Sequence, residues 1–184
     1  MKNTKTHQIV LIGLMAAIVF VSTAFIHIPI PTPTGTTMLK TGNIFCLLAA
    51  LLLGKLNGGL AAGIGSMFYD LLNPLYISSA PFTLVFFFTM AYIAGTLFEL
   101  INPTKSAKKI VLLPCLVGTF SYVALYFTKS VIASMLLGTT FIPAIMMNIP
   151  KLGTSSLNAT IATIGATILF PICATLLKKN KILI

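Results

Sequence analysis

Long apolar runs, separated by short polar segments, dominate the pattern of the chain. A helix that crosses the hydrocarbon core of a bilayer takes about 20 predominantly apolar residues, and most of the runs approach that length. The sequence therefore predicts an all-α integral membrane protein in which residues 1–184 form a single six-helix membrane domain. The expected helices cover residues 9–26, 41–54, 57–72, 82–102, 109–128 and 155–177.

Two stretches interrupt this pattern. Residues 27–40, HIPIPTPTGTTMLK, are too polar and too rich in proline to span a bilayer, so we expect a loop there. Residues 131–147 are apolar but short, and Gly138 and Pro143 interrupt them. We expect this stretch to finish the fifth helix and to form an apolar cap on the outer side, ahead of the last helix at 155–177.

The low content of charged residues excludes a soluble globular domain. Charged residues make up 8% of the chain, whereas a soluble domain carries about 25%. The net charge of +10 comes from twelve basic residues, all lysine, against two acidic ones, Asp70 and Glu99. On a soluble protein this imbalance would suggest nucleic acid. Here the lysines stand between apolar runs and arginine is absent, so we expect no nucleic-acid partner.

The positions of the lysines predict the orientation in the membrane, because cytoplasmic loops carry an excess of basic residues. With six spans and a cytoplasmic N-terminus, nine lysines fall on the inner side and three on the outer side. A seventh span would move the C-terminal lysines outside. We therefore expect a multi-pass protein of a bacterial cytoplasmic membrane with both termini in the cytoplasm. The outer lysines are Lys40, Lys129 and Lys151, and we expect the first two to lie at the membrane interface.

No motif for catalysis or for a cofactor is visible, so we expect neither an enzyme nor a bound cofactor or metal. Cys46, Cys115 and Cys173 each lie inside an apolar run, as small buried hydrophobic residues do. Asp70 and Glu99 are expected on opposite sides of the membrane. Their separation argues against a self-sufficient, proton-coupled secondary transporter, which remains an alternative.

Tyrosine and asparagine side chains gather on the expected outer side. A tyrosine near a helix end is commonly an interfacial anchor, but the one-sided clustering predicts a pocket with aromatic walls and amide groups. A small, planar, neutral heterocycle would suit such a lining. The expected pocket residues are Asn43, Tyr76, Tyr122, Tyr126 and Asn158, with Asp70 at the edge.

The first helix carries a small patch at Gly13, Ala16 and Ala17. Small residues let two helices approach closely in a membrane. The patch can therefore either pack inside the bundle or dock another membrane subunit, and composition alone does not choose between them.

Residues 41–72 and 80–97 resemble the S component, or substrate-binding subunit, of energy-coupling factor (ECF) vitamin transporters. Within these, the chain resembles the riboflavin-type family, which includes pyridoxine and hydroxymethylpyrimidine carriers. It departs from the family pattern at Phe87-Phe88 and at Pro150-Lys151-Leu152. The matching positions are Gly42-Asn43, Gly54, Gly63, Gly65-Ser66, Asp70-Leu71 and Pro81-Phe82-Thr83.

The resemblance implies six helices and high-affinity binding of a vitamin near the outer face. It also implies partners, namely a transmembrane T component and two cytoplasmic ATPases whose ATP hydrolysis topples the S component. In such proteins small residues of the first helix dock the T component, which favours docking for Gly13, Ala16 and Ala17. We expect pyridoxine or hydroxymethylpyrimidine before riboflavin, because the expected pocket has little cationic character and the chain has no Trp.

Overall fold

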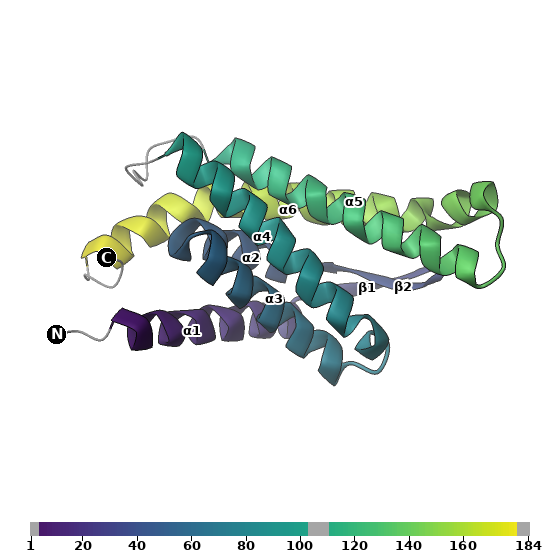
Figure 1. Cartoon of the computed structure of the whole chain (residues 1–184), viewed down its shortest axis with the longest axis horizontal. Helices are drawn as coiled ribbons and strands as arrows, with labels where there is room; N and C mark the ends of the chain where they lie inside the picture. The colour runs from purple at the N-terminus through teal and green to yellow at the C-terminus, as the bar shows by residue number, and fades with distance from the viewer. Residues whose placement is uncertain (1–3, 103–110, 180–184) are drawn as a thin grey trace.

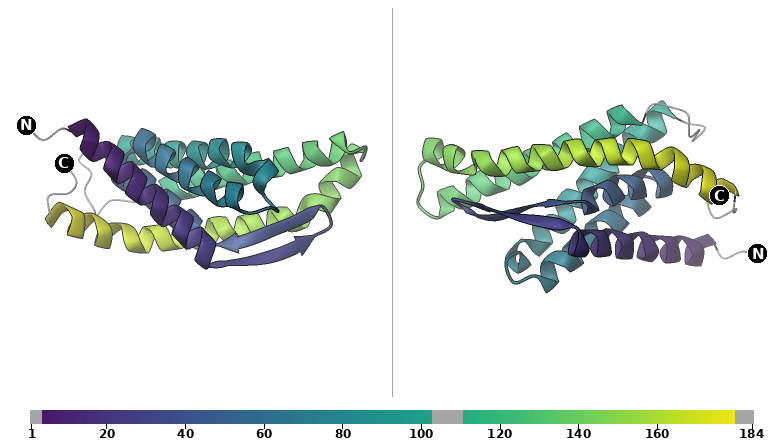
Figure 2. Two further views of the ribbon diagram at one scale, coloured as in Figure 1. Left: turned by 90° about the horizontal axis from the view of Figure 1, so that it is seen from below. Right: turned by 180° about the vertical axis from the view of Figure 1, so that it is seen from behind.

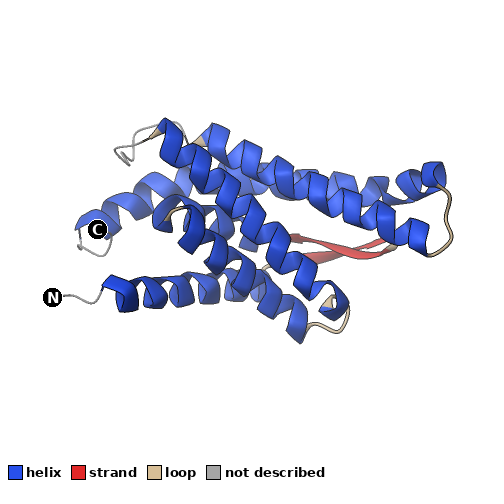
Figure 3. Ribbon diagram, viewed as in Figure 1, coloured by secondary structure: helices blue, strands red, loops and turns tan. Residues whose placement is uncertain are grey.

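The computed structural model describes residues 4–102 and 111–179. These residues form six α-helices, one two-stranded antiparallel sheet and a short 3-10 helix (Figures 1 and 3). In chain order the elements are α1 (Thr4–Phe25), β1 (His27–Thr32), β2 (Gly35–Lys40), α2 (Gly42–Leu53), α3 (Lys55–Leu72), η1 (Ile77–Ser79), α4 (Ala80–Ile101), α5 (Leu112–Leu136) and α6 (Phe141–Lys179).

Four helical segments of the described chain are long and apolar enough to cross a membrane, so the protein is a mostly helical membrane protein. They are Lys5–Phe25, Ile77–Ile101, Leu112–Leu136 and Phe141–Leu177. Helix α2 is different, because at 1.5 Å per residue its 12 residues reach only about 18 Å. It is enclosed instead by α1, α3, α4 and α6, and most of its residues are buried.

The expectation of an all-α fold is wrong at residues 27–40, which form a β-hairpin (Figure 3). The prolines do not prevent pairing. Pro29 and Pro31 are two residues apart, so the positions where they lack an N–H group face the same edge of β1. The alternating residues of β1 keep their N–H groups for the ladder with β2. Gly35, with φ of 110°, starts β2 directly after the two-residue turn.

The boundary between α5 and α6 also differs from the expectation. The apolar stretch 131–147 is divided between two helices, with Gly138 at φ 92° in the turn that joins them. Pro143 lies in the first turn of α6, where a missing N–H costs nothing. Residues 148–154, which were expected to lie outside the last helix, are helical, and Pro150 lies inside α6. The first half of α6 therefore runs along the hairpin (Figure 2).

Close packing around α2 and α3 depends on glycine. A Cβ at Gly58 would lie 2.4 Å from the Cα of Ala50, so α2 and α3 approach backbone to backbone across their short connection. A Cβ at Gly65 would lie 2.4 Å from the backbone oxygen of Ala16, so α1 packs equally closely on α3. These contacts use small residues as membrane helix interfaces commonly do.

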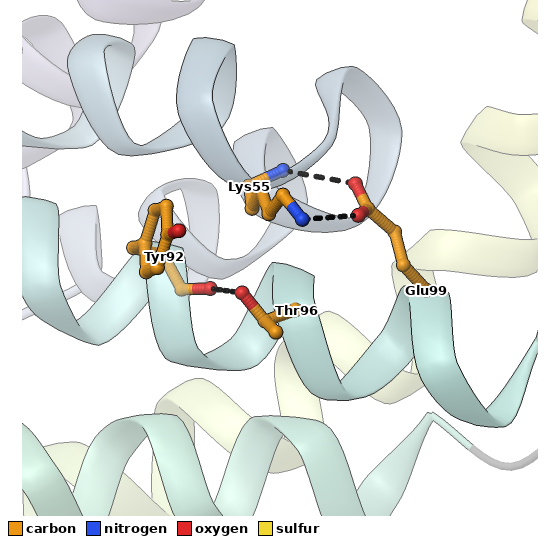
Figure 4. Close-up of polar contacts among 4 residues, drawn as sticks. All are labelled: Lys55, Tyr92, Thr96 and Glu99. Carbon is orange, nitrogen blue, oxygen red and sulfur yellow. Dashed lines mark hydrogen bonds and ion pairs between the residues drawn. The ribbon is translucent and has the colours of Figure 1, made fainter.

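One of the two carboxylates joins α4 to the start of α3 (Figure 4). Glu99 Oε2 lies 3.4 Å from Lys55 Nζ, and Glu99 Oε1 accepts a hydrogen bond from the backbone N–H of Lys55 at 3.3 Å. A negative charge at a helix N-terminus is stabilising because it faces unpaired N–H groups and the positive end of the helix dipole. Gly54 fits here with φ of 84°, because a Cβ would lie 3.0 Å from Glu99 Oε1.

The start of α1 and the end of α6 lie at the same end of the molecule, and the hairpin turn and the α5–α6 turn lie at the other (Figures 1 and 2). Lys5, Lys55 and Lys179 belong to helix ends at the first of these. The inner-side assignments of Lys2, Lys105, Lys108, Lys109 and Lys181 fall outside the described residues.

We predict that the end holding Lys5 and Lys179 faces the cytoplasm, because nine of the twelve lysines are assigned to that side. A membrane-impermeant thiol reagent should not label Lys5→Cys or Lys179→Cys in intact cells, and should label both after permeabilisation. Thr140→Cys, in the α5–α6 turn, should be labelled without permeabilisation, and the parent chain with its three native cysteines sets the background. Labelling of Lys5→Cys or Lys179→Cys from outside would contradict this orientation.

Candidate ligand cavity

A cavity of about 520 Å³ lies between the hairpin and helices α4, α5 and α6. Its volume falls in the range of small-molecule sites, roughly 300–1,000 Å³. The hairpin contributes lining residues from Pro33 to Lys40, and Asp70 reaches the cavity from the end of α3. The structure thus brings together segments that are far apart in the sequence.

Aromatic rings form one wall of the cavity. Tyr122 and Tyr126 are one helical turn apart on α5, and their rings stack with centroids 5.9 Å apart at an interplanar angle of 15°. Phe87 of α4 packs on Tyr122 with a centroid distance of 4.7 Å. The Tyr126 hydroxyl lies 3.5 Å from Thr37 Oγ1 of the hairpin. This wall offers a π-face to a planar ligand.

Tyr76, expected in the pocket, and Asp70, expected at its edge, both line the cavity. The hydroxyl oxygen of Tyr76 is buried and has no hydrogen-bond partner among the residues that the structure describes. Burial raises the pKa of this hydroxyl to about 12, so it stays protonated and can donate a hydrogen bond. The Asp70 carboxylate accepts a hydrogen bond from Thr83 Oγ1 of α4.

Asn158 lines the cavity but uses its amide group to hold the hairpin. Its Oδ1 accepts the backbone N–H of Lys40 at 2.9 Å, and its Nδ2 donates to the backbone oxygen of Met38 at 2.8 Å. The side chain thus pairs with β2 as a neighbouring strand would. We expected a ligand-binding asparagine, and the geometry gives it a positioning role at the cavity.

A second set of contacts fastens the hairpin turn. Thr34 Oγ1 donates to Asn148 Oδ1 at 2.9 Å, and Lys151 Nζ donates to the backbone oxygen of Thr34 at 2.8 Å. Asn148 Nδ2 in turn donates to Ser134 Oγ of α5 at 2.9 Å. The hairpin is therefore held along its whole length and covers one side of the cavity.

Lys40 and Lys129, which were expected at the membrane interface, both line the cavity together with Lys151. Lys40 Nζ lies 4.4 Å from the centroid of the Phe87 ring, and Lys129 Nζ donates to Ser79 Oγ at 2.9 Å. Burial lowers the pKa of the Lys40 ammonium, and its attraction to Asp70 opposes that shift. Because three lysines line the cavity, the expectation of a pocket with little cationic character is wrong.

The polar residues of this cavity recur at helical spacing, a pattern that the sequence analysis did not use. Residues 148, 151, 155 and 158 are polar at steps of three or four, so they share one face of α6. Because the last helix was expected to begin at residue 155, this shared face was not predicted. The same spacing places Tyr122, Tyr126, Lys129 and Ser130 on the facing side of α5.

Asn43 does not reach the cavity, so the structure does not bring it together with the other expected pocket residues. It lies in the first turn of α2, where its side chain is buried and its Oδ1 has no hydrogen-bond partner among the described residues. That turn packs directly on α1, because a Cβ at Gly42 would meet Thr23 Oγ1 and the backbone oxygen of Val19.

The small patch of α1 divides between two faces of the helix. Ala16 is buried and packs on α3 through its backbone oxygen, opposite Gly65. Gly13 and Ala17 are exposed, and a Cβ at Gly13 would meet nothing within 4 Å. Ala16 thus packs inside the bundle, and Gly13 and Ala17 lie on the exposed face of α1.

A comparison with known families decides what kind of protein carries this cavity. The family model described as the S component of the ECF-type riboflavin transporter matches residues 3–177. The chain belongs to this family. The match confirms the resemblance seen in residues 41–97, and it identifies a multi-pass membrane S component rather than an enzyme. S components partner with a module of T and ATPase subunits.

Two further proteins are similar to the chain. A solved structure of the S component of a bacterial ECF transporter superposes with a TM-score of 0.68 at 19% identity, and the match covers 95% of this chain and 99% of that one. This likeness concerns the fold alone. The chain is also 43% identical over 77 residues to an uncharacterized protein in gap 3′ region of Pyrococcus woesei. This alignment covers 42% of this chain and 49% of that relative. The chain thus spans about half the length of this curated relative.

We predict that Asn158→Ala loosens the hairpin, because it removes both bonds to the β2 backbone. Loss of buried hydrogen bonds worth about 1–3 kcal/mol should speed local opening by about 5- to 150-fold. Hydrogen–deuterium exchange of peptides covering residues 35–41 measures this change. Asn57→Ala, in the first turn of α3 away from the cavity, is the matched control and should leave these peptides unchanged. Unchanged exchange in Asn158→Ala would contradict the anchoring role.

Proposed function

We propose that the chain is the high-affinity substrate-binding subunit of an ECF importer for a small heterocyclic vitamin or vitamin precursor. The observation that carries this proposal is the 520 Å³ cavity in a chain of the S-component family. The stacked rings of Tyr122 and Tyr126 provide a surface for a planar ring. The unpartnered hydroxyl of Tyr76 provides a donor that a ligand acceptor would satisfy.

Within this proposal, a single ring the size of pyridoxine or hydroxymethylpyrimidine is our first expectation. The stacked pair is built from two tyrosines and the chain has no Trp, which suits a small ring better than a large one. Riboflavin, the substrate named in the family description, is the alternative.

The proposed partners are a transmembrane T component and two cytoplasmic ATPases, with ATP hydrolysis driving uptake. Gly13 and Ala17 support a docking surface on α1, because they are exposed, small and four residues apart on one helix face. Ala16 supports that surface from within, through its packing on α3. Co-purification of the chain with an ATPase pair, and uptake that requires those ATPases, tests the assignment. Uptake by the chain alone would indicate a self-sufficient secondary transporter instead.

We predict that Tyr76→Phe weakens ligand binding without weakening the fold, because the hydroxyl that it removes is buried without a partner among the described residues. Loss of a ligand hydrogen bond should reduce the affinity by about 5- to 150-fold, measured by calorimetric titration with pyridoxine, hydroxymethylpyrimidine and riboflavin. Tyr122→Ala should give a loss of similar size by removing a stacking ring.

Tyr92→Phe is the matched control for this titration, because Tyr92 lies on α4 beside Phe88 and away from the cavity. Its affinity should equal that of the parent chain. If Tyr76→Phe and Tyr122→Ala both bind as tightly as the parent, the ligand does not occupy this cavity.

We predict that Ala17→Trp impairs assembly and uptake while ligand binding by the isolated subunit is retained. A bulky ring in the centre of the exposed α1 face would prevent close approach of a T-component helix. Pull-down of the ATPases and cellular uptake measure the effect. Ala17→Ser, which stays small, and Phe120→Trp, on an exposed face of α5, are controls that should assemble normally. Normal uptake by Ala17→Trp would exclude this face as the docking surface.

A further inference from the structure

The cavity is lined by more positively than negatively charged side chains, and the chain has too few carboxylates to balance them. Three lysines line the cavity, whereas Asp70 is the only acidic residue there. The sequence contains one other carboxylate, Glu99, which is paired with Lys55 at the opposite end of the molecule (Figure 4). No protein carboxylate is therefore left to balance the two remaining ammonium groups.

The excess charge comes from lysines on two helices. Asp70 acts electrostatically on Lys40 and Lys129, while Lys151 is acted on by the like charge of Lys129. Lys151 projects from α6 and reaches the hairpin turn at Thr34, whereas Lys129 projects from α5 and its Nζ lies beside Ser79 and 5.2 Å from the centroid of the Phe82 ring. Charges that are partly removed from water are costly unless they are paired.

Both of these lysines retain hydrogen-bonding capacity. Lys129 Nζ donates to Ser79 Oγ and Lys151 Nζ to the backbone oxygen of Thr34, and both acceptors are neutral. An ammonium group has three N–H donors, so each lysine keeps donors for a further partner. Ser130 and Ser155 also line the cavity, but their hydroxyls donate to the backbone oxygens of Tyr126 and Lys151, so the free donors belong to the two lysines.

The aromatic wall and Lys129 lie in register on α5. Tyr122, Tyr126 and Lys129 follow one another at steps of four and three residues, so they form one stripe along the helix. All three line the same cavity as Lys151. A ring stacked on the tyrosines would therefore share this cavity with the two ammonium groups.

We infer that the ligand of this S component is a planar ring that carries an anionic substituent, a carboxylate or a phosphate ester, bound between Lys129 and Lys151. This inference rests on the proposed function and corrects the expected neutral ligand. Lys40 lies over the Phe87 ring and is attracted to Asp70. Lys129 and Lys151 select the anion.

The test compares matched ligands that differ only in the anionic group, with the full chain in neutral-lipid nanodiscs. The pairs are pyridoxine and pyridoxine 5′-phosphate, nicotinamide and nicotinate, and riboflavin and its 5′-phosphate. In at least one pair the anionic member should bind about tenfold or more tightly than the neutral one. Lys151→Gln and Lys129→Gln should abolish that preference, so that in each variant the affinities for the two members of the pair become equal within about twofold.

Two control variants separate charge from folding. Lys151→Arg keeps the positive charge and should keep the preference, whereas Lys55→Gln removes a lysine at the other end of the molecule and should have no effect. An equal or stronger affinity for the neutral member of every pair that binds would overturn the anionic ligand and leave the proposed function intact. If none of the six compounds binds, the inference also fails, and co-purification with the ATPases still decides the proposed function.

A lipid phosphate could supply the same chemistry, so one arm of the test uses nanodiscs with anionic phosphatidylglycerol. The preferred anionic ligand should bind equally well in neutral and anionic nanodiscs. Competition by phosphatidylglycerol that Lys151→Gln removes would assign Lys129 and Lys151 to a lipid headgroup and overturn their role in ligand selection.

Discussion

The pairing of Asn158 with the backbone of β2 is the contact on which the cavity depends. A hairpin of two strands is marginally stable by itself, and this one carries prolines that limit its ladder. The two hydrogen bonds from one amide side chain attach β2 to α6, and Asn148 and Lys151 hold the turn at the other end. The hairpin thereby becomes a fixed wall, and Lys40 at its end reaches Phe87.

The two carboxylates of the chain have different tasks at opposite ends. Glu99 stabilises the start of α3 and the packing of α3 on α4 by binding both the backbone N–H and the ammonium group of Lys55. Asp70 accepts a hydrogen bond from Thr83 and acts electrostatically on two lysines of the cavity. With so few acidic groups, each additional lysine that folding brings to the cavity adds positive charge that only a ligand, lipid or solvent can balance.

Small residues lie both at internal helix contacts and on the exposed face of α1 in this fold. Gly58 and Gly65 are required inside, because a Cβ at either position would overlap a neighbouring backbone. Gly13 and Ala17 have no such neighbour and remain at the surface of α1. Close internal packing makes α1 part of a rigid unit, so a partner that docks on its exposed face could act on the whole bundle and the cavity it carries.

The sequence by itself determined the membrane character, the approximate position of most helices and much of the cavity. Long apolar runs with few charges can be buried only in a bilayer, and that property is local to each run. The clustering of Asp70, Tyr76, Tyr122, Tyr126 and Asn158 followed from the order of the helices, because alternate connections return to the same side. The family pattern in residues 41–97 added the class of protein.

Only the tertiary structure decided the hairpin, the start of α6, the position of the lysines and the exclusion of Asn43. Each of these depends on a partner that is distant in the sequence. Residues 27–40 form strands because α6 presents Asn158 and Asn148 to them. The polar face of α6 at Asn148, Lys151, Ser155 and Asn158 meets the hairpin and the cavity. A lysine near a helix end can reach either the membrane surface or the interior of the protein, and the packing of the hairpin against α5 and α6 determines which of the two it meets.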